Sequence, residues 1–247
     1  MTLKTDWAFI EKVLGDDHTR TVFLGGKTGT GKTYTAMRSG LGGRNLYCVT
    51  LTPETPAAEL RGFWMPKGNE FVWQDGVFIS AMREGARVVV NEIAHASHDV
   101  LALMYPILES EETAALTLPT GETVRPAKGF QVICTDNVSI DYLPEALQNR
   151  FDSILNVTSP HPAAIARLNP GFREAARRAF DLDEGRGVSI RGWIQVQKYA
   201  ESMGSEDAFR ACFGEERGHQ LYTATLLMDD DGVTEMCEDD DDDDDNE

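Results

Sequence analysis

Apolar residues along this chain fall into short runs separated by longer stretches with helical spacing. The short runs contain many β-branched residues and have the length of single strands: 21–24, 45–51, 88–92, 130–135 and 153–157. Continuous runs of this kind are typical of strands buried on both faces of a parallel sheet. Helical spacing predicts helices at 5–14, 34–39, 57–62, 77–84 and 97–109. The alternation of the two patterns predicts an α/β fold.

Two segments interrupt this alternation with the signature of β-hairpins. In residues 63–76, aromatic residues flank the turn sequence Lys67-Gly68-Asn69-Glu70. Residues 114–118 and 122–125, joined by Pro119-Thr120-Gly121, predict a second hairpin. The aromatic hairpin is interpreted as a moving loop that contacts a partner. The alternative is a hairpin that packs its aromatic side chains on its own domain.

Prolines at 160, 162 and 170 mark the end of the α/β region. The pattern then becomes helical at 172–180, 190–201, 207–213 and 219–228, which predicts a small helical lid. Seven consecutive aspartates at 239–245 repel one another and bury nothing, which predicts disorder. The expected domains are therefore an α/β core at 1–158, a lid at 159–228 and a disordered acidic tail at 229–247.

The turn after the first predicted strand has the spacing of a phosphate-binding loop, the P-loop. Its glycines free the backbone to turn N–H groups inward, and the N-terminus of the following helix favours negative charge. The lysine can reach the β- and γ-phosphates, and the last threonine can hold Mg²⁺. The residues are Gly26, Lys27, Thr28, Gly29, Thr30, Gly31, Lys32 and Thr33. The sequence therefore predicts a site for a nucleoside triphosphate.

Polar residues end two of the predicted strands, at the sheet edge that faces the ligand in α/β folds. Asn91 and Glu92 end the run at 88–92, and Asn137 follows the run at 130–135. Glu92 is expected to act as general base toward the attacking water. Asn137 is expected to position that water, and the alternative is a turn-forming asparagine. Asn91 is expected at the metal, although P-loop ATPases usually carry an aspartate there.

The formal net charge of −18 comes mostly from the C-terminal stretch. From Asp229 onward the chain has 13 of its 41 acidic residues, and the other 28 face 23 Lys and Arg residues, a net charge of −5. A basic excess typical of nucleic-acid-binding domains is missing from the composition, although a local basic strip stays open. Without 18 uninterrupted apolar residues or a secretory signal pattern, the chain is expected to be cytoplasmic and to have no membrane partner.

Together these segments resemble an AAA+ ATPase of the MoxR and dynein-related group, from about residue 22 to residue 200. The P-loop, the run 88–92 and residues 133–137 are similar to the Walker A, Walker B and sensor 1 motifs. Residues 143–152 resemble the arginine-finger box, which implies a finger role for Arg150. Residues 189–193 resemble the sensor 2 helix, which implies a phosphate contact by Arg191. The two hairpins fall where this group carries its helix 2 insert and its presensor 1 hairpin.

The resemblance implies a parallel-sheet core with helices on both faces, two hairpin insertions and a helical lid. It implies ATP and Mg²⁺ as ligands, with Thr33 and Asn91 at the metal. It also implies a homo-oligomeric ring, usually a hexamer, that remodels or activates a client protein, often one with a von Willebrand A domain. Asn91 departs from the family pattern, which has an aspartate at this position.

Three functions stay open at this stage, in the following order. The first is an ATP-hydrolysing remodelling motor that relies on Glu92, Asn137, Arg150 and Arg191. The second is a nucleotide-dependent assembly module with weak hydrolysis, which Asn91 motivates because an amide lacks the negative charge of a carboxylate. The third is an ATPase subunit of a nucleic-acid-processing system, similar to the dynein-related subunit of some restriction systems.

Overall fold

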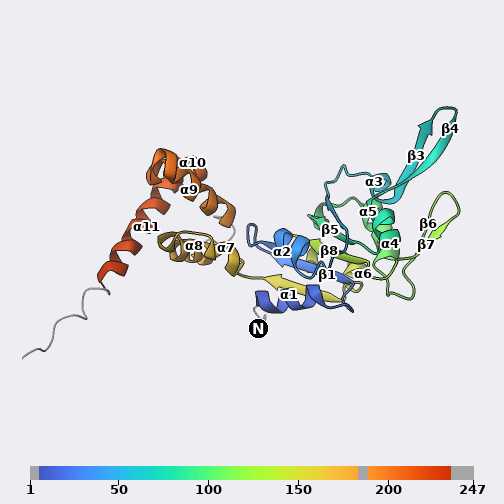
Figure 1. The fold of residues 1–247 in the computed structure, drawn as a ribbon, viewed down its shortest axis with the longest axis horizontal. Helices are drawn as coiled ribbons and strands as arrows, with labels where there is room; N and C mark the ends of the chain where they lie inside the picture. The colour runs from blue at the N-terminus through green and yellow to red at the C-terminus, as the bar shows by residue number, and fades with distance from the viewer. Residues whose placement is uncertain (1–5, 183–188, 235–247) are drawn as a thin grey trace, which may run out of the picture. The chain divides into compact units, whose positions relative to one another are not determined.

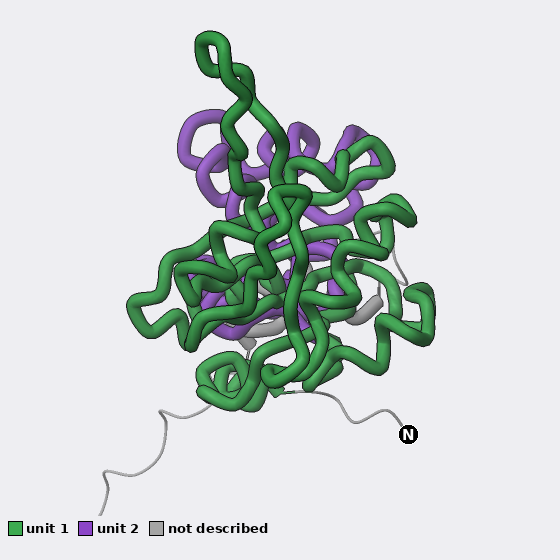
Figure 2. Tube along the Cα trace, turned by 90° about the vertical axis from the view of Figure 1, so that its right-hand side faces the viewer, with its two compact units in different colours: residues 1–27, 31–158 green, residues 28–30, 159–247 purple. Residues whose placement is uncertain are grey.

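The chain forms two compact units (Figures 1 and 2). This computed structural model describes residues 6–182 and 189–234. Unit 1 comprises Met1–Lys27 and Gly31–Thr158, and unit 2 comprises Thr28–Thr30 and Ser159–Glu247. The residues that were predicted to end strands at the ligand edge all belong to unit 1.

Unit 1 is built on a five-stranded parallel sheet with the order β2-β5-β8-β1-β9. Each strand coincides with one of the predicted runs: β1 (Thr21–Gly26), β2 (Leu46–Thr50), β5 (Arg87–Asn91), β8 (Gln131–Thr135) and β9 (Ser153–Val157). The P-loop strand β1 lies beside β8, and β8 lies beside β5. The carboxyl ends of these three neighbouring strands therefore bring their polar residues to one edge of the sheet.

Helices cover both faces of this sheet, as the resemblance implied. Successive side chains of a strand point to opposite faces, so Val89 packs with one helical layer while Val88 and Val90 pack with the other. The first layer contains α1 (Trp7–Gly15) and α2 (Lys32–Arg38). The second contains α3 (Ala57–Arg61), α4 (Val77–Glu84), α5 (His98–Ile107) and α6 (Glu145–Gln148). The predicted core, a parallel sheet with helices on both faces, is therefore confirmed.

Both predicted hairpins are present in unit 1. The first pairs β3 (Gly62–Lys67) with β4 (Glu70–Asp75), and the second pairs β6 (Leu116–Thr117) with β7 (Thr123–Val124). In the first hairpin Phe71 is 70% exposed, and Phe63 and Trp64 are exposed as well. Trp73 is half-buried and packs against the core. Most of the aromatic surface of this hairpin is therefore available to another molecule.

Unit 2 is helical and has its own core. Its elements are α7 (Pro162–Ala166), α8 (Pro170–Leu182), α9 (Ile190–Met203), α10 (Ser205–Phe213) and α11 (Glu215–Thr234). Trp193 of α9 and Phe209 of α10 are both buried, with ring centroids 5.4 Å apart and planes at 87°. This edge-to-face arrangement is the favourable geometry for two aromatic rings.

Several boundaries differ from those predicted. Helix α2 begins at Lys32 instead of residue 34, because Gly31 takes a left-handed conformation (φ 106°) and the helix starts directly after it. Helix α5 ends at Ile107 instead of residue 109, shortly after Pro106, which cannot donate a backbone hydrogen bond. The short helices α7, η1 (Ile93–His95) and η2 (Ile140–Tyr142) were not predicted.

The largest difference concerns the start of the acidic tail, predicted at residue 229. Helix α11 continues to Thr234, so the beginning of that stretch is helical. The physical reason is that each residue added to an existing helix gains one backbone hydrogen bond, whereas only nucleation is costly. The rest of the predicted tail, residues 235–247, lies outside the described residues.

Candidate nucleotide site

Lys32 is the central cation of the site in unit 1. Its side chain is only 6% exposed, and its Nζ donates to the carbonyl oxygens of Gly26 (2.6 Å) and Lys27 (2.8 Å) and to Oδ1 of Asn137 (3.1 Å). Burial lowers the pKa of Lys32 to about 8, and the negative charges of Glu92 and Asp136 oppose this shift. A buried cation whose hydrogen bonds go to neutral groups is well placed to bind an anion.

Gly26 and Gly31 give the P-loop backbone its shape. Gly26 has φ 134°, and a Cβ atom there would lie 2.1 Å from the carbonyl oxygen of Val157. Gly31 precedes α2 in the left-handed region. Side chains rarely adopt these conformations, so only glycine fits both positions without strain. Thr28–Thr30, at the tip of the loop, group with unit 2.

Asn91 lies beside Thr33, as the metal-site prediction requires. Its Oδ1 accepts hydrogen bonds from the Thr33 hydroxyl (2.8 Å) and from the Thr135 hydroxyl (2.9 Å). Its Nδ2 donates to Sγ of the exposed Cys48, at 3.3 Å. The amide is thus oriented with its oxygen toward Thr33. Hydroxyl and amide oxygens are ligands that Mg²⁺ accepts, so this donor pair fits the ion, but it lacks the carboxylate charge.

Glu92 lies directly after β5, and Asn137 lies two residues after the end of the neighbouring strand β8. The Nδ2 of Asn137 is 3.1 Å from Oε1 and 3.3 Å from Oε2 of Glu92. Glu92 has φ 58°, the one positive φ recorded for a non-glycine residue in the described ranges. Such a conformation costs roughly 1–3 kcal/mol and is typical of functional sites. The structure therefore brings together the predicted base and the predicted water-positioning amide.

The sequence prediction gave Asp136 no role. In the structure it contacts the backbone after both β5 and β8. Its carboxylate is 2% exposed, accepts from the backbone N–H of Ala94 (2.7 Å) and accepts from the N–H groups of Asn137 (2.7 Å) and Val138 (3.2 Å). The only sequence signal was an acidic residue at the end of a buried strand. Its backbone partner Ala94, 42 residues away, could not be read from the sequence.

Arg150 follows α6 in unit 1 and is held within its own chain. Its Nη2 lies 2.5 Å from Oε1 of Glu109, its Nη1 donates to the carbonyl of Ala146, and its guanidinium stacks over the ring of Tyr105 at 5.2 Å. The bond to Ala146 is the type of helix-end contact that a non-catalytic arginine also makes. In this single chain Arg150 does not join the cluster of Lys32, Glu92 and Asn137.

Arg191 belongs to unit 2. It is an exposed residue, the second of α9. The hydroxyl of Ser189 caps this helix by accepting from the N–H of Gly192 (3.2 Å). Its role toward a phosphate stays a prediction.

The sequence matches a family model that covers most of unit 1. The model of the AAA domain of the dynein-related subfamily matches residues 21–151, more than half of the chain. The chain belongs to this family. The match begins with the P-loop strand and ends directly after Arg150, so it contains the whole cluster described above.

Individual relatives of this AAA protein support the same assignment. NorQ of Paracoccus denitrificans is 36% identical over 117 residues, which cover 47% of this chain and 43% of NorQ. The denitrification regulatory protein NirQ is 30% identical over 234 residues in Pseudomonas aeruginosa (86% and 88% of the two chains) and 26% identical over 237 residues in Stutzerimonas stutzeri (86% and 84%). The chain spans about half the length of several curated relatives that it matches, NorQ among them.

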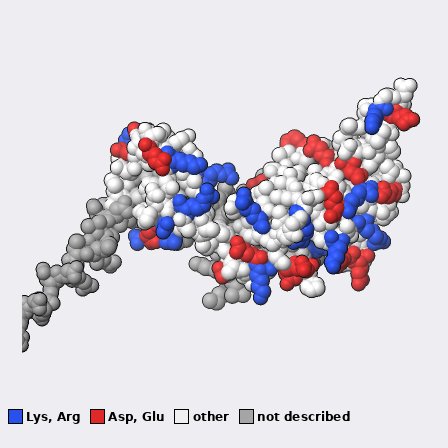
Figure 3. All heavy atoms as spheres, viewed as in Figure 1, with Lys and Arg blue, Asp and Glu red and all other residues white. Residues whose placement is uncertain are grey.

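On the face drawn in Figure 3, basic and acidic side chains are interspersed over unit 1 of this AAA protein. A nucleic-acid-binding face would carry a basic stripe, which this view of unit 1 does not show. Over the described residues, no helix is long and apolar enough to cross a membrane.

Proposed function

We propose that this chain binds ATP with Mg²⁺, hydrolyses it, and uses the cycle to remodel or activate a partner protein. The juxtaposition of Lys32, Glu92 and Asn137 at one edge of the sheet is the observation that carries the proposal. Lys32 and the P-loop backbone would bind the phosphates, since a buried cation and inward N–H groups favour anions. Thr33 and Asn91 would hold Mg²⁺, which would neutralise phosphate charge.

In this proposal Glu92 is the general base for hydrolysis. Its carboxylate would accept a proton from the attacking water, and the amide of Asn137, which already bonds to Glu92, would orient that water. A fixed base and a fixed water lower the entropic part of the barrier, because the reacting atoms are aligned before the reaction starts.

We further propose that copies of the chain form a ring, a hexamer, in which Arg150 acts at the nucleotide of a neighbouring copy. Arg150 lies outside the cluster of its own chain, so a second chain is needed for it to reach a γ-phosphate. A guanidinium suits this role because its planar fork stays charged and can bind spreading phosphoryl charge. Arg191 is proposed to contact a phosphate from the lid.

The partner protein is proposed to bind the exposed aromatic hairpin β3–β4. Exposed Phe63, Trp64 and Phe71 on a two-stranded projection offer apolar surface that the core does not use. The names of the relatives associate NirQ with the regulation of denitrification, which is consistent with an action on another protein. A client with a von Willebrand A domain is the candidate implied by the family resemblance.

The decisive experiment measures ATP binding by calorimetry and Mg²⁺-dependent phosphate release with the full chain. Lys32→Ala should abolish ATP binding because the site loses its buried cation. Lys12→Ala, which removes an exposed lysine from α1, is the matched control and should bind ATP like the unmodified chain. Unchanged ATP affinity in Lys32→Ala would refute the nucleotide site.

Asn91 supports a second candidate function, a nucleotide-dependent assembly module that hydrolyses ATP weakly. The amide occupies the position at which ATPases of this type carry an aspartate, and its oxygen is already engaged by two hydroxyl groups. A neutral ligand binds a divalent cation less strongly than a carboxylate. ATP binding and ATP-dependent assembly without measurable phosphate release would favour this candidate over the first.

A further inference from the structure

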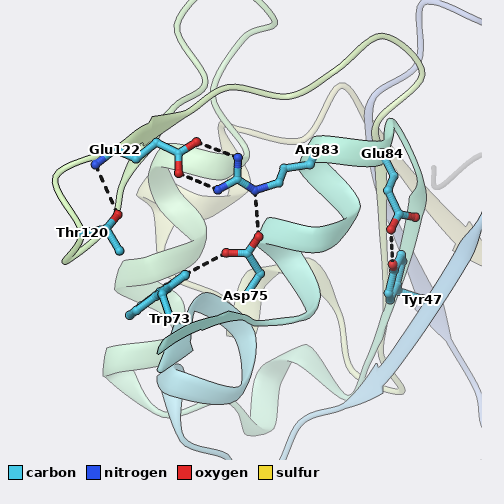
Figure 4. Close-up of polar contacts among 7 residues, drawn as sticks. All are labelled: Tyr47, Trp73, Asp75, Arg83, Glu84, Thr120 and Glu122. Atoms are coloured by element: carbon cyan, nitrogen blue, oxygen red, sulfur yellow. Dashed lines mark hydrogen bonds and ion pairs between the residues drawn. The ribbon is translucent and has the colours of Figure 1, made fainter. Parts of the chain in front are cut away.

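Arg83 is a cation of unit 1 that lies outside the nucleotide cluster. It belongs to the last turn of α4, and Figure 4 shows its guanidinium between the carboxylates of Asp75 and Glu122. Its Nε donates to Oδ2 of Asp75 at 2.7 Å. Its Nη1 and Nη2 donate to the two carboxylate oxygens of Glu122 at 2.6 and 2.7 Å. One side chain of α4 thus binds two acidic residues that come from two different hairpins.

Asp75 connects this guanidinium to the aromatic hairpin. It is the last residue of β4, and its second oxygen accepts from the indole N–H of Trp73 at 2.8 Å. Trp73 in turn contacts Trp64 of β3 edge-on, with ring centroids 5.5 Å apart. Because Asp75 bonds to Arg83 and Trp73 at the same time, displacement of the hairpin strands would strain or break the contact with Arg83.

Glu122 connects the same guanidinium to the second hairpin. It lies in the turn between β6 and β7, where its backbone carbonyl accepts from the N–H of Leu118 and its own N–H donates to the hydroxyl of Thr120. After β7 the chain continues through residues 125–130 into β8, which ends two residues before Asn137. The turn is thus part of the segment that precedes the sensor strand.

Exposed ion pairs usually contribute little, and Arg83 is 38% exposed while Glu122 is 50% exposed. This contact differs in geometry, because both Nη atoms meet both carboxylate oxygens and the Nε binds a second acid. Such bidentate contacts are more directional and stronger than single ion pairs. The hydrogen bonds from Arg83 lower the pKa of Glu122, because they stabilise its ionised form.

We propose that Arg83 is a positioning residue that holds the β3–β4 and β6–β7 hairpins in a fixed relation to each other. Displacement of the aromatic hairpin then displaces the β6–β7 hairpin, and a partner bound to one hairpin acts on the segment leading to β8. The coupling itself follows from the contacts of Arg83, Asp75 and Glu122. Its use by a partner protein rests on the proposed function.

The test measures hydrogen exchange by mass spectrometry on the full chain without nucleotide. Glu122→Gln removes the bidentate contact from one hairpin, and the readout is the other hairpin, residues 62–75. Exchange there should become about three- to tenfold faster, since loss of a directional contact raises the population of the open state. Glu112→Gln, which changes an exposed acid in the connection before β6, is the matched control and should leave residues 62–75 at the original rate.

Reciprocal variants separate coupling from a local effect. Asp75→Asn should speed hydrogen exchange in residues 116–124. Arg83→Glu alone should remove protection from exchange, and the charge-swapped double variant with Arg83→Glu and Glu122→Arg should restore part of it. Arg83→Lys keeps the charge but not the fork, so it should speed exchange in both hairpins. Two results would overturn the proposal. One is an unchanged exchange rate in both hairpins of Arg83→Lys, and the other is faster exchange in Glu122→Gln that is confined to the β6–β7 hairpin.

The result does not depend on catalysis. If the cross-hairpin effect is seen in a chain that neither binds nor hydrolyses ATP, the proposed function fails while the positioning role of Arg83 stands. If ATP turnover is normal and the effect is missing, the positioning role fails alone. Exchange in α1 and β9, which lie away from both hairpins in the sequence, reports any general loss of stability.

Discussion

The carboxylate of Asp136 accepts a hydrogen bond from the backbone N–H of Ala94 at 2.7 Å, which ties the end of β8 to the turn after β5. The turn includes Glu92, whose backbone lies in the left-handed region. The same carboxylate accepts from the N–H of Asn137. One buried acid therefore fixes the backbone next to both proposed catalytic side chains.

Replacing this acid should reduce turnover more than binding. In Asp136→Asn one carboxylate oxygen becomes an NH₂ group, so a donor faces a backbone donor, which costs about 1–3 kcal/mol. If the turn shifts and Glu92 moves with it, kcat should fall about tenfold or more, with ATP affinity changed less than about threefold.

Single-turnover phosphate release and ATP calorimetry on the same preparation measure the two quantities. Asp141→Asn, an exposed acid in η2, is the control and should retain its rate. An Asp136→Asn chain that melts at lower temperature but keeps its rate per folded molecule would show that Asp136 has only a structural role.

Asn91→Asp tests whether the missing carboxylate limits the metal site. The new negative charge would lie beside the Thr33 hydroxyl, where it adds a charged ligand for Mg²⁺. A charged hydrogen-bonding group contributes roughly 1.5–3 kcal/mol, so Mg²⁺-dependent turnover should rise about tenfold. Turnover measured over a range of Mg²⁺ concentrations gives the result, and Asn69→Asp in the hairpin turn controls for the added charge. An unchanged or lower rate would mean that the site already works with an amide.

Mixing experiments test the proposed role of Arg150 in a neighbouring copy. Arg150→Ala and Lys32→Ala should each be inactive alone, the first with ATP affinity preserved. Loss of an arginine finger costs on the order of 10³ or more in rate. Co-assembled rings of the two variants contain interfaces with an intact Lys32 site facing an intact Arg150, so phosphate release should partly return.

The contact between Arg150 and Glu109 requires a separate control. Glu109→Gln removes the intrachain ion pair but leaves the guanidinium in place. Turnover should stay within about threefold of the original, because an ion pair that is partly open to solvent contributes little. If Arg150→Ala is nearly fully active, or if proven mixed rings stay inactive at every ratio, Arg150 does not act in a neighbouring site.

Arg87 is predicted to stabilise the folded chain and to take no part in catalysis. It is fully buried at the start of β5, and all of its hydrogen-bond acceptors are neutral oxygens. Its guanidinium donates to the side-chain oxygen of Gln131 and to the backbone carbonyls of Leu14, Ala36, Ser39 and Gly40. Burial, with a smaller effect from Arg44, lowers the pKa of Arg87 to about 10. The cation satisfies carbonyl groups at the ends of α1 and α2, where the helices leave them without partners.

Arg87→Lys should therefore lower the free energy of unfolding by about 2–4 kcal/mol, because an ammonium cannot reach all of these carbonyls and unsatisfied buried groups are costly. Urea denaturation measures the change. Arg44→Lys is the matched control, since Arg44 also bonds to loop carbonyls but is half-buried, and its loss should be below about 1 kcal/mol. Equal losses in both variants would contradict a special role for Arg87.

The sequence predicted the features that are encoded locally. The five strands, the two hairpins and the P-loop depend on residue periodicity, turn residues and spacing within short segments, so each could be recognised without the rest of the chain. The common position of Glu92 and Asn137 was also predicted, because parallel strands place their carboxyl ends at one edge of the sheet whatever the strand order.

The tertiary structure alone decided which side chains contact distant side chains and backbone groups. Asp136 with Ala94, Arg87 with Leu14, and Arg83 with Glu122 are 42, 73 and 39 residues apart in the chain. Such contacts depend on strand order and helix packing, which no local pattern encodes. The orientation of Asn91 toward Thr33 and the intrachain ion pair of Arg150 belong to the same class. The sequence thus determined the chemistry that the chain carries, whereas packing decided how buried charges are held in place.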